Sequence, residues 1–152
     1  MPFSTAYANN ILNWAMGRTD GLSRHEQVWI GLCYNDPEAD KGEFRELSGY
    51  GYGRVLVSQF GEVYPGLISA ATERLIANGK QIAFTKATGG DWLDSDGNSP
   101  SGYGLFTTSS GGTPFFYAKL NDPVPTPAGS VFLFDPNELK ISFKDVDEDI
   151  TE

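Results

Sequence analysis

The chain has 152 residues, with 20 acidic against 11 basic side chains and a formal net charge of -9. So few clustered Lys and Arg argue against contacts with a phosphate backbone, so we expect no nucleic-acid partner. No window approaches the roughly 18 to 20 apolar residues of a membrane span, and the start of the sequence lacks the basic-then-apolar order of a signal peptide, so we expect no membrane partner either.

The same composition predicts one domain built from short strands. A chain of this length buries a single core, and 18 glycines, 9 prolines and 13% aromatic residues favour turns and strands over long helices. Cys33 is the only cysteine, which excludes an intramolecular disulfide and a zinc site built on cysteines. We expect its thiol to be buried and inert.

Residues 4–16 are predicted to form the one helix. Ser4 or Thr5 can cap its first amides, and Gly17 supplies the stop. Apolar residues recur on one face at helical spacing, namely Tyr7, Ile11, Trp14 and Ala15. We therefore expect the helix to lie with this face against a sheet and Trp14 to belong to the core.

Several strands follow the helix. In residues 26–34, Val28, Ile30, Leu32 and Tyr34 alternate with Trp29, Gly31 and Cys33. Because both sets are largely apolar, we expect a strand covered on both faces, and residues 55–59 are predicted to form another strand. Residues 67–77 have helical composition, yet Asn78-Gly79 is equally a hairpin turn. We favour a hairpin of residues 72–77 and 80–85, and whether 67–77 is helix or strand stays open.

Residues 101–120 carry the clearest local pattern, two aromatic-rich runs joined by a Ser/Gly turn at residues 108–113, which predicts a β-hairpin. Two further strands are expected at 131–134 and 139–143. The count of seven or eight strands predicts a mainly β fold, a single antiparallel β-sandwich of jelly-roll type with one N-terminal helix. Ser109 and Ser110 in the hairpin turn are candidates for contact with a neighbour.

The end of the sequence is acidic. We expect a domain over residues 1–144 and a tail over residues 145–152. A solvated end is one interpretation; in the other, Val146 and Ile150 alternate with acidic residues and add to the edge of a partner's sheet.

The inventory of catalytic residues is small. A Ser-His-Asp triad would have to use the single histidine, His25, and the sequence contains no Gly-x-Ser-x-Gly motif that would present the nucleophilic serine. We therefore predict that the protein is not an enzyme. Asp94, Asp96 and Asn98 alternate as in a calcium loop, but the glycine is displaced and no glutamate closes the pattern. Ordinary turn chemistry is the alternative for this stretch, and we expect no cofactor.

Aromatic side chains in loops are candidates for binding. Tyr50, Tyr52 and Trp92 combine a large contact area with a polar group, which suits a protein partner or the face of a sugar. Tyr103 and Tyr117 lie in predicted strands, where we expect them to be half-buried.

The order of several sequence blocks resembles a family of small all-β bacteriophage virion proteins commonly labelled phage tail fibre proteins. The resemblance begins in the helix at residues 8–12 and covers most of the sequence up to Phe143. It is carried by five blocks in the same order, residues 28–37, 46–57, 82–88, 102–112 and 131–142. The sequence departs from the family at residues 41–45, at 89–100 and in the acidic tail, where we expect contacts specific to one particle.

The resemblance implies a non-enzymatic virion structural protein, made in the host cytoplasm and then part of the particle. It implies an accessory component (capsid decoration, neck or collar, or tail fibre) that forms homo-oligomers and contacts major capsid, neck or tail proteins. The alternative is a carbohydrate-binding module that contacts host glycans through Trp92, Tyr50 and Tyr52.

Overall fold

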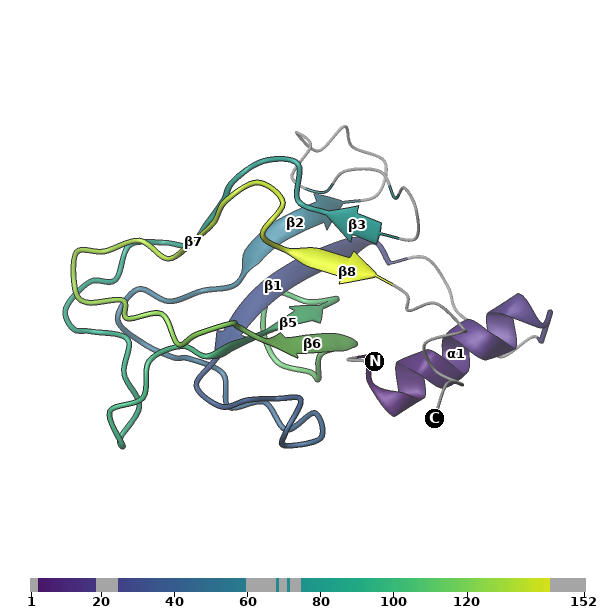
Figure 1. The fold of residues 1–152 in the computed structure, drawn as a ribbon, viewed down its shortest axis with the longest axis horizontal. Coiled ribbons are helices and arrows are strands. Elements are labelled where there is room, and N and C mark those ends of the chain that lie inside the picture. Colours follow the sequence, from purple (N-terminus) through teal and green to yellow (C-terminus); the bar gives the residue numbers. More distant parts are fainter. Residues whose placement is uncertain (1–2, 19–24, 60–67, 69–70, 72–74, 143–152) are drawn as a thin grey trace.

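The computed structural model describes residues 3–18, 25–59, 68, 71 and 75–142, and the structural statements below concern these residues. The fold is mainly β, as predicted (Figure 1). In chain order its elements are α1 (Thr5–Ala15), β1 (Gln27–Cys33), β2 (Val55–Gln59), β3 (Leu75–Ala77), β4 (Ile82–Ala83), β5 (Gly102–Phe106), β6 (Phe116–Lys119), β7 (Leu133–Phe134) and β8 (Lys140–Ser142).

The largest sheet is antiparallel, with the strand order β2-β1-β5-β6. Its β5–β6 hairpin confirms the prediction for residues 101–120. In β1 and β5, Ile30 lies opposite Leu105 and Leu32 opposite Tyr103, so one face of the sheet carries a continuous apolar surface.

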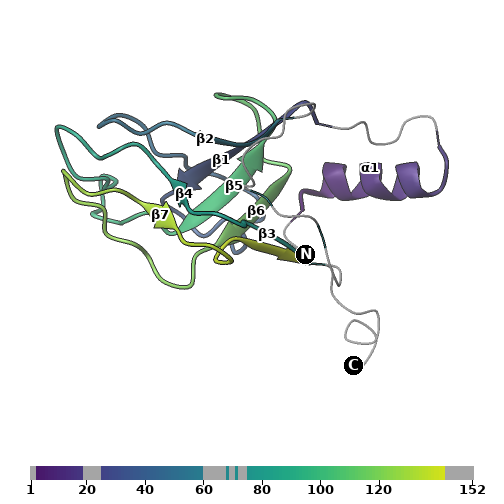
Figure 2. The ribbon, with the colours of Figure 1, turned by 90° about the horizontal axis from the view of Figure 1, so that it is seen from above.

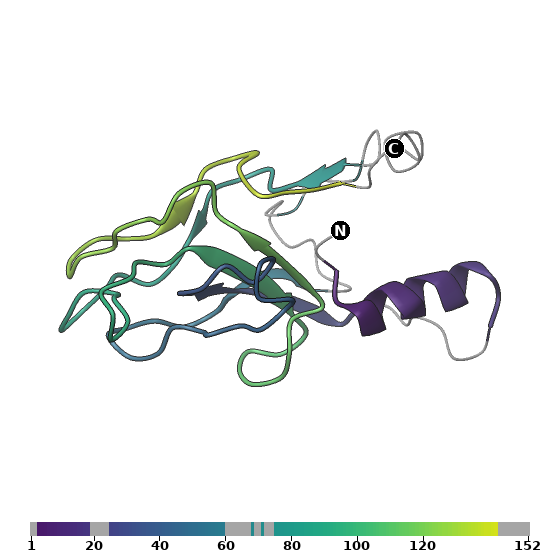
Figure 3. The ribbon, with the colours of Figure 1, turned by 60° about the horizontal axis from the view of Figure 1, so that its bottom comes forward.

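A two-stranded ribbon covers that apolar face. In it, β3 pairs with β8 and β4 pairs with β7, both antiparallel. Figure 3 shows this ribbon, in teal and yellow-green, as a separate layer over the sheet. The core lies between the two layers, where the rings of Tyr103 and Phe134 meet edge to face with their centroids 5.6 Å apart.

Glycines let the loop after β1 cover the other face of the sheet. A Cβ at Gly31 would lie 2.9 Å from a carboxylate oxygen of Glu46, and one at Gly104 would lie 2.8 Å from the ring of Phe44. Because these positions carry no side chain, the loop packs directly on the strands. The prediction that the first strand is covered on both faces is therefore confirmed, since Ile30 to Cys33 are all buried.

The predicted hairpin of residues 72–77 and 80–85 is wrong in its pairing. Residues 75–77 and 82–83 are strands, but they pair with β8 and β7 and not with each other. Asn78 is extended and fully buried, and its side chain bonds the opposite strand of the ribbon. The Asn-Gly pair thus interrupts a strand where a turn was predicted; residues 67, 69–70 and 72–74 lie outside the described residues.

Helix α1 is present but its predicted packing is wrong. The Ser4 hydroxyl accepts a hydrogen bond from the Tyr7 amide, as a helix cap should. None of the residues Thr5–Ala15 is buried, and Trp14 is 63% exposed. Figure 2 shows α1 projecting from the end of the β layers, so the apolar stripe has no sheet beneath it.

Candidate functional site

Helix α1 is held at its base by a cluster of aromatic rings. Tyr7 stacks against Phe3 and His25 and packs on Phe115, with ring centroids 4.8 to 5.5 Å apart. A hydrogen bond of 2.9 Å joins His25 Nε2 to the Tyr7 hydroxyl, and the Ser4 amide donates to the Phe115 carbonyl. The partial burial of this cluster lowers the pKa of His25 and raises that of Tyr7. These contacts fix the direction in which the helix leaves the body.

Beyond this base the helix presents an exposed apolar surface. Leu12, Trp14 and Met16 are 63%, 63% and 80% exposed. At about 100° per residue, the apolar side chains spread over roughly half of the helix circumference. We call this the α1 apolar face and define it by Ile11, Leu12, Trp14, Ala15 and Met16.

The helix also carries no charge. The first charged residue in the sequence is Arg18, and the side of α1 opposite its apolar face bears the amide of Asn13, with Asn9 and Asn10 at the two borders. An exposed helix in a soluble chain is ordinarily rich in charged residues. An exposed helix that lacks them is typical of a surface covered by a partner.

An apolar groove opens beside the base of α1, between the sheet and the ribbon. We call it the end groove. It has a volume of about 240 Å³. Its lining, among the described residues, is apolar except for His25 and Ser58, and otherwise consists of Val28, Val57, Ile68, Ile76, Ala77, Leu105, Phe115, Leu139 and Ile141.

A second, polar groove of about 370 Å³ lies next to the β5–β6 turn. It brings together Tyr52, Ser109 and Ser110 of the predicted contact residues, and both serines are exposed. Glu46 and Arg54 also line this groove.

The floor of this polar groove is a rigid network. Glu46 accepts two hydrogen bonds of 2.8 Å from Arg54 and one of 2.7 Å from the Tyr52 hydroxyl. The Arg54 guanidinium also lies 3.5 Å from the ring centre of Phe106. Burial, followed by the bond to Glu46, raises the pKa of Tyr52. Because each of these groups is already paired, the network holds the loops to the sheet.

The expectation of an exposed Trp92 is wrong. Trp92 is 1% exposed, and its indole N–H donates to the Tyr50 carbonyl at 3.0 Å. Its ring meets that of Tyr52 edge to face. The loop folds inward because the indole finds both an apolar site and an acceptor there. Of the three predicted aromatics, Tyr50 is exposed, Tyr52 is half-buried, and Trp92 is not accessible to a partner.

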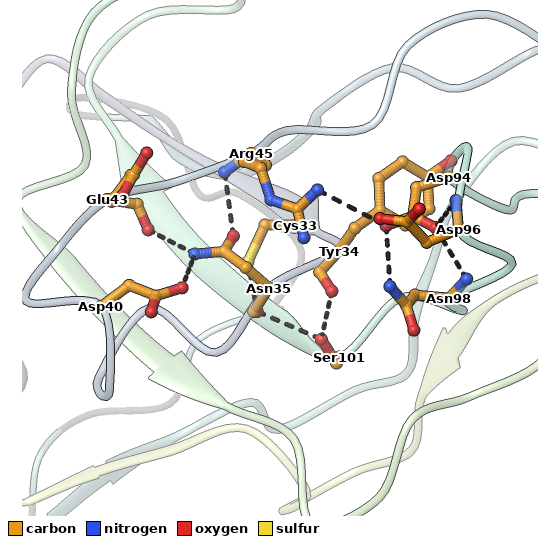
Figure 4. A network of polar contacts seen from close by, with 10 residues as sticks. All are labelled: Cys33, Tyr34, Asn35, Asp40, Glu43, Arg45, Asp94, Asp96, Asn98 and Ser101. Atoms are coloured by element: carbon orange, nitrogen blue, oxygen red, sulfur yellow. Dashed lines mark hydrogen bonds and ion pairs between the residues drawn. The ribbon is translucent and has the colours of Figure 1, made fainter.

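The stretch with calcium-like spacing forms a turn. The Asp94 carboxylate accepts hydrogen bonds from the amides of Asp96 and Asn98 and from the Asn98 side chain (Figure 4). These bonds lower the pKa of Asp94, and Arg45 lies 3.5 Å from its other oxygen. The part of the chain that the structure describes holds no group of three or more His, Cys, Asp or Glu side chains suited to a metal ion. The carboxylate therefore serves the turn, and its geometry lends no support to calcium.

The end of β1 holds a second polar network, centred on Asn35. Its amide donates to Asp40 and to the Glu43 carbonyl and accepts from the Arg45 amide (Figure 4). The neighbouring Cys33 thiol donates to the Asn35 carbonyl. Burial raises the pKa of Cys33 to about 12, so this thiol stays protonated at neutral pH and is a poor nucleophile.

Comparison with known families places the chain. A family model described as "Podophage GP4 fiber I protein gp80" matches residues 2–142. The chain belongs to this family. The match confirms the resemblance to phage tail fibre proteins, and this fibre protein is a structural component of the virion. None of the curated proteins compared with the chain matches it. Within the described residues, no helix has the length and apolar character needed to cross a membrane.

Sequence reasoning did not identify the exposed apolar residues of α1 in this fibre protein. It assigned Trp14 to the core and missed Leu12 and Met16 as surface residues. The lack of charge before Arg18 is the signal that would have found them, because a helix against the core still has a solvated, charged side. Val146 and Ile150, predicted for partner contact, lie outside the described residues.

Proposed function

We propose that this fibre protein is a non-enzymatic structural subunit that joins other virion proteins through the α1 apolar face. The observation that carries the proposal is the projecting helix itself. It has 11 residues and buries none of them. Isolated helices of this length are marginally stable in water, so contact with a partner would stabilise it.

The chemistry of the reactive side chains supports a role without catalysis. His25 shares a hydrogen bond with the Tyr7 hydroxyl and stacks on Phe115, and the Cys33 thiol stays protonated. The carboxylates of Glu46 and Asp94 are held by structural donors. These groups hold loops and the helix base in place and leave no free acid and base pair among them.

Protein contact is favoured over glycan contact. The glycan alternative relied on Trp92, Tyr50 and Tyr52; Trp92 is buried and the Tyr52 hydroxyl is bonded to Glu46, so Tyr50 is the one fully exposed ring of the three. The α1 apolar face, by contrast, combines three large exposed apolar side chains, Leu12, Trp14 and Met16, which is the composition of an interface core. We therefore propose capsid, neck or tail proteins, or copies of the fibre protein, as partners.

A pair of charge substitutions tests this proposal. Trp14→Lys places a charge in the α1 apolar face, whereas Asn13→Lys places the same charge on the opposite side of the helix. Each variant is supplied during particle assembly, and the subunit is quantified in purified virions by mass spectrometry. We expect Trp14→Lys to lose incorporation at least about tenfold, equivalent to about 1.4 kcal/mol of contact energy, while Asn13→Lys is retained. Equal incorporation of two variants that both fold, as judged by circular dichroism, would contradict the proposal.

A further inference from the structure

We propose that a pocket between β6 and the ribbon binds an extended, uncharged segment of a neighbouring virion protein. We call it the lateral pocket. The inference rests on the part of the proposed function in which the fibre protein joins other virion proteins, and it adds a second contact surface that shares no residue with the α1 apolar face.

The lateral pocket lies on the open side of the two β layers. β6 is an outer strand of the sheet, and β7 and β8 each pair on one side only. The described lining comes from β5, from the end of β6 and the loop after it, and from residues 132–140 of the ribbon, and it includes no residue of β3 or β4. With a volume of about 400 Å³, the pocket falls in the range of about 300 to 1,000 Å³ that is usual for binding sites.

The hydroxyl of Tyr103 opens into this pocket without a partner. Tyr103 is 7% exposed, and its ring packs against Phe116 and Phe134. Every buried side-chain nitrogen and oxygen of the described residues has a hydrogen-bond partner, whereas the Tyr103 hydroxyl has none among them, so it is accessible from the pocket. Burial, followed by the charge of Glu38, raises the pKa of Tyr103. The hydroxyl therefore keeps its proton and can donate to a ligand.

The ribbon turns unpaired main-chain groups toward the same side. The Phe84 amide donates to the Phe132 carbonyl, so the next residue, Leu133, points its N–H and C=O away from β4. Likewise, the Leu139 carbonyl accepts from the strand opposite, so Lys140 points its main-chain groups away from β3. An extended segment can bond such groups at the edge of a sheet.

The facing edge of the sheet is already closed at this level. The N–H of Lys119 points outward from β6 and donates to the Glu38 carboxylate at 3.0 Å. A bound segment would therefore pair with the ribbon and meet the sheet through side chains.

The charges of the lining favour an uncharged segment. Lys119 and Lys140 are balanced by Asp122 and Glu138, in a chain of net charge -9, and neither lysine forms an ion pair with a described residue. Glu38 adds a negative charge nearby but is bonded to the Lys119 N–H. A charged ligand would meet a like charge close to each opposite one. A neutral peptide avoids this repulsion and offers carbonyl oxygens to the two ammonium groups and to the phenolic hydroxyl.

The apolar part of the lining favours a peptide over a sugar. Leu133 and Val124 are 42% and 39% exposed, and an apolar side chain of the bound segment would cover them together with Leu120. The rings of Phe132 and Phe134 are only 3% and 5% exposed. They offer no open aromatic face on which a sugar could stack.

Removing the Tyr103 hydroxyl tests the contact. In the free subunit Tyr103→Phe deletes a group without an internal partner, so we expect the Tm to change by less than about 1 °C. In the particle the variant loses a hydrogen bond, and we expect its incorporation into virions, in competition with the unmodified chain, to fall about 3- to 10-fold by mass spectrometry. Tyr117→Phe is the control, because its hydroxyl also lacks a partner among the described residues but does not line the pocket. Equal incorporation of the two variants overturns the inference.

Labelling of a single cysteine tests the position of the contact. Leu133→Cys lies in the pocket, and Leu93→Cys lies outside it at a similar exposure, since the two leucines are 42% and 44% exposed. Cys33 is buried and protonated in both. We expect maleimide to label both positions at similar rates in the free subunit, but Leu133→Cys at least about tenfold more slowly than Leu93→Cys in intact virions. Equal rates in virions overturn the inference.

Two further comparisons separate the alternatives. Binding of the free subunit to a glycan array that is lost in Tyr103→Phe and kept in Tyr117→Phe would overturn the peptide and assign the pocket to a saccharide. Normal incorporation of Trp14→Lys would remove the proposed role of α1, while protection of Leu133→Cys in the same particles would still support the lateral pocket. Loss of Trp14→Lys without that protection would keep the proposed function and remove this inference.

Discussion

Asn78 joins the two strands of the ribbon, and its replacement should destabilise the whole fold. Its side-chain amide donates to the carbonyls of Lys80 and Asp135, and its oxygen accepts from the Leu139 amide, each at 2.9 Å. The residue is fully buried. Asn78→Ala therefore removes three hydrogen bonds and leaves the Leu139 N–H without a partner inside the protein.

The expected cost of Asn78→Ala is about 3 kcal/mol. Each bond contributes roughly 1 kcal/mol net, and an unpaired buried donor costs about 1 to 3 kcal/mol. For a domain of this size that loss corresponds to a Tm lower by about 6 to 12 °C. Urea unfolding followed by circular dichroism measures the change, and Gln81→Ala, which removes one exposed bond to Asp135, should cost less than about 0.5 kcal/mol.

Asn78→Asp gives the same site a dependence on pH. The aspartate keeps the acceptor for Leu139 but turns a carboxylate toward the carbonyls of Lys80 and Asp135. Burial and these carbonyls favour the neutral acid, so its pKa in the folded state lies above the unfolded value of about 3.9. The variant should approach the unmodified stability near pH 4 and lose it as pH rises. A cost of less than about 1 kcal/mol for Asn78→Ala, or a pH-independent Asn78→Asp, would refute the reasoning.

Three further experiments test the packing of the loop after β1 against the large sheet. Gly102→Ala puts a Cβ 2.6 Å from the ring of Pro37 and should lower the free energy of unfolding by about 1 to 3 kcal/mol. In Gly53→Ala the new Cβ meets nothing within 4 Å, so this control should change stability little. Equal midpoints of urea unfolding for the two variants would contradict the prediction. Glu46→Ala removes the carboxylate that accepts two hydrogen bonds from the Arg54 guanidinium, whose side chain is 2% exposed against 26% for Glu46, and leaves it the Thr108 carbonyl as an acceptor. We expect a loss of about 2 to 3 kcal/mol, less than for a fully buried pair, and an unchanged unfolding curve would show that the pair contributes nothing. The Cys33 thiol, with a pKa of about 12, should resist maleimide at pH 7.5 until the chain is unfolded; rapid labelling of native protein would show an accessible sulfur.

Elements whose signals are local were predictable from the sequence. The β5–β6 hairpin depends on its own turn at residues 108–113, and both strands lie within the two aromatic-rich runs. The coverage of β1 on both faces followed from its unbroken apolar run. Gly31 and Gly104, which make room for the covering loop, can be seen in the sequence. The sequence does not show that the side chains of Glu46 and Phe44 fill that room.

Strand pairing and exposure were not predictable, because they depend on distant partners. Asn78 satisfies an amide at Leu139, far along the chain, and this bond removes the turn that its local sequence favours. Trp92 is buried because a carbonyl at Tyr50 receives its N–H. Trp14 shows the opposite case, since helical periodicity identifies an apolar face but does not say whether the same chain covers it.

The aromatic base of α1 has a consequence for the order of folding. Although α1 comes first in the sequence, the ring that Tyr7 packs on belongs to Phe115, beside β6, and β1 must pair with β5 before that hairpin has its place. Such pairings between distant segments close slowly, and a short helix alone is marginal. We therefore expect the direction of α1 to be set late in folding, after the strands that carry Phe115 have paired.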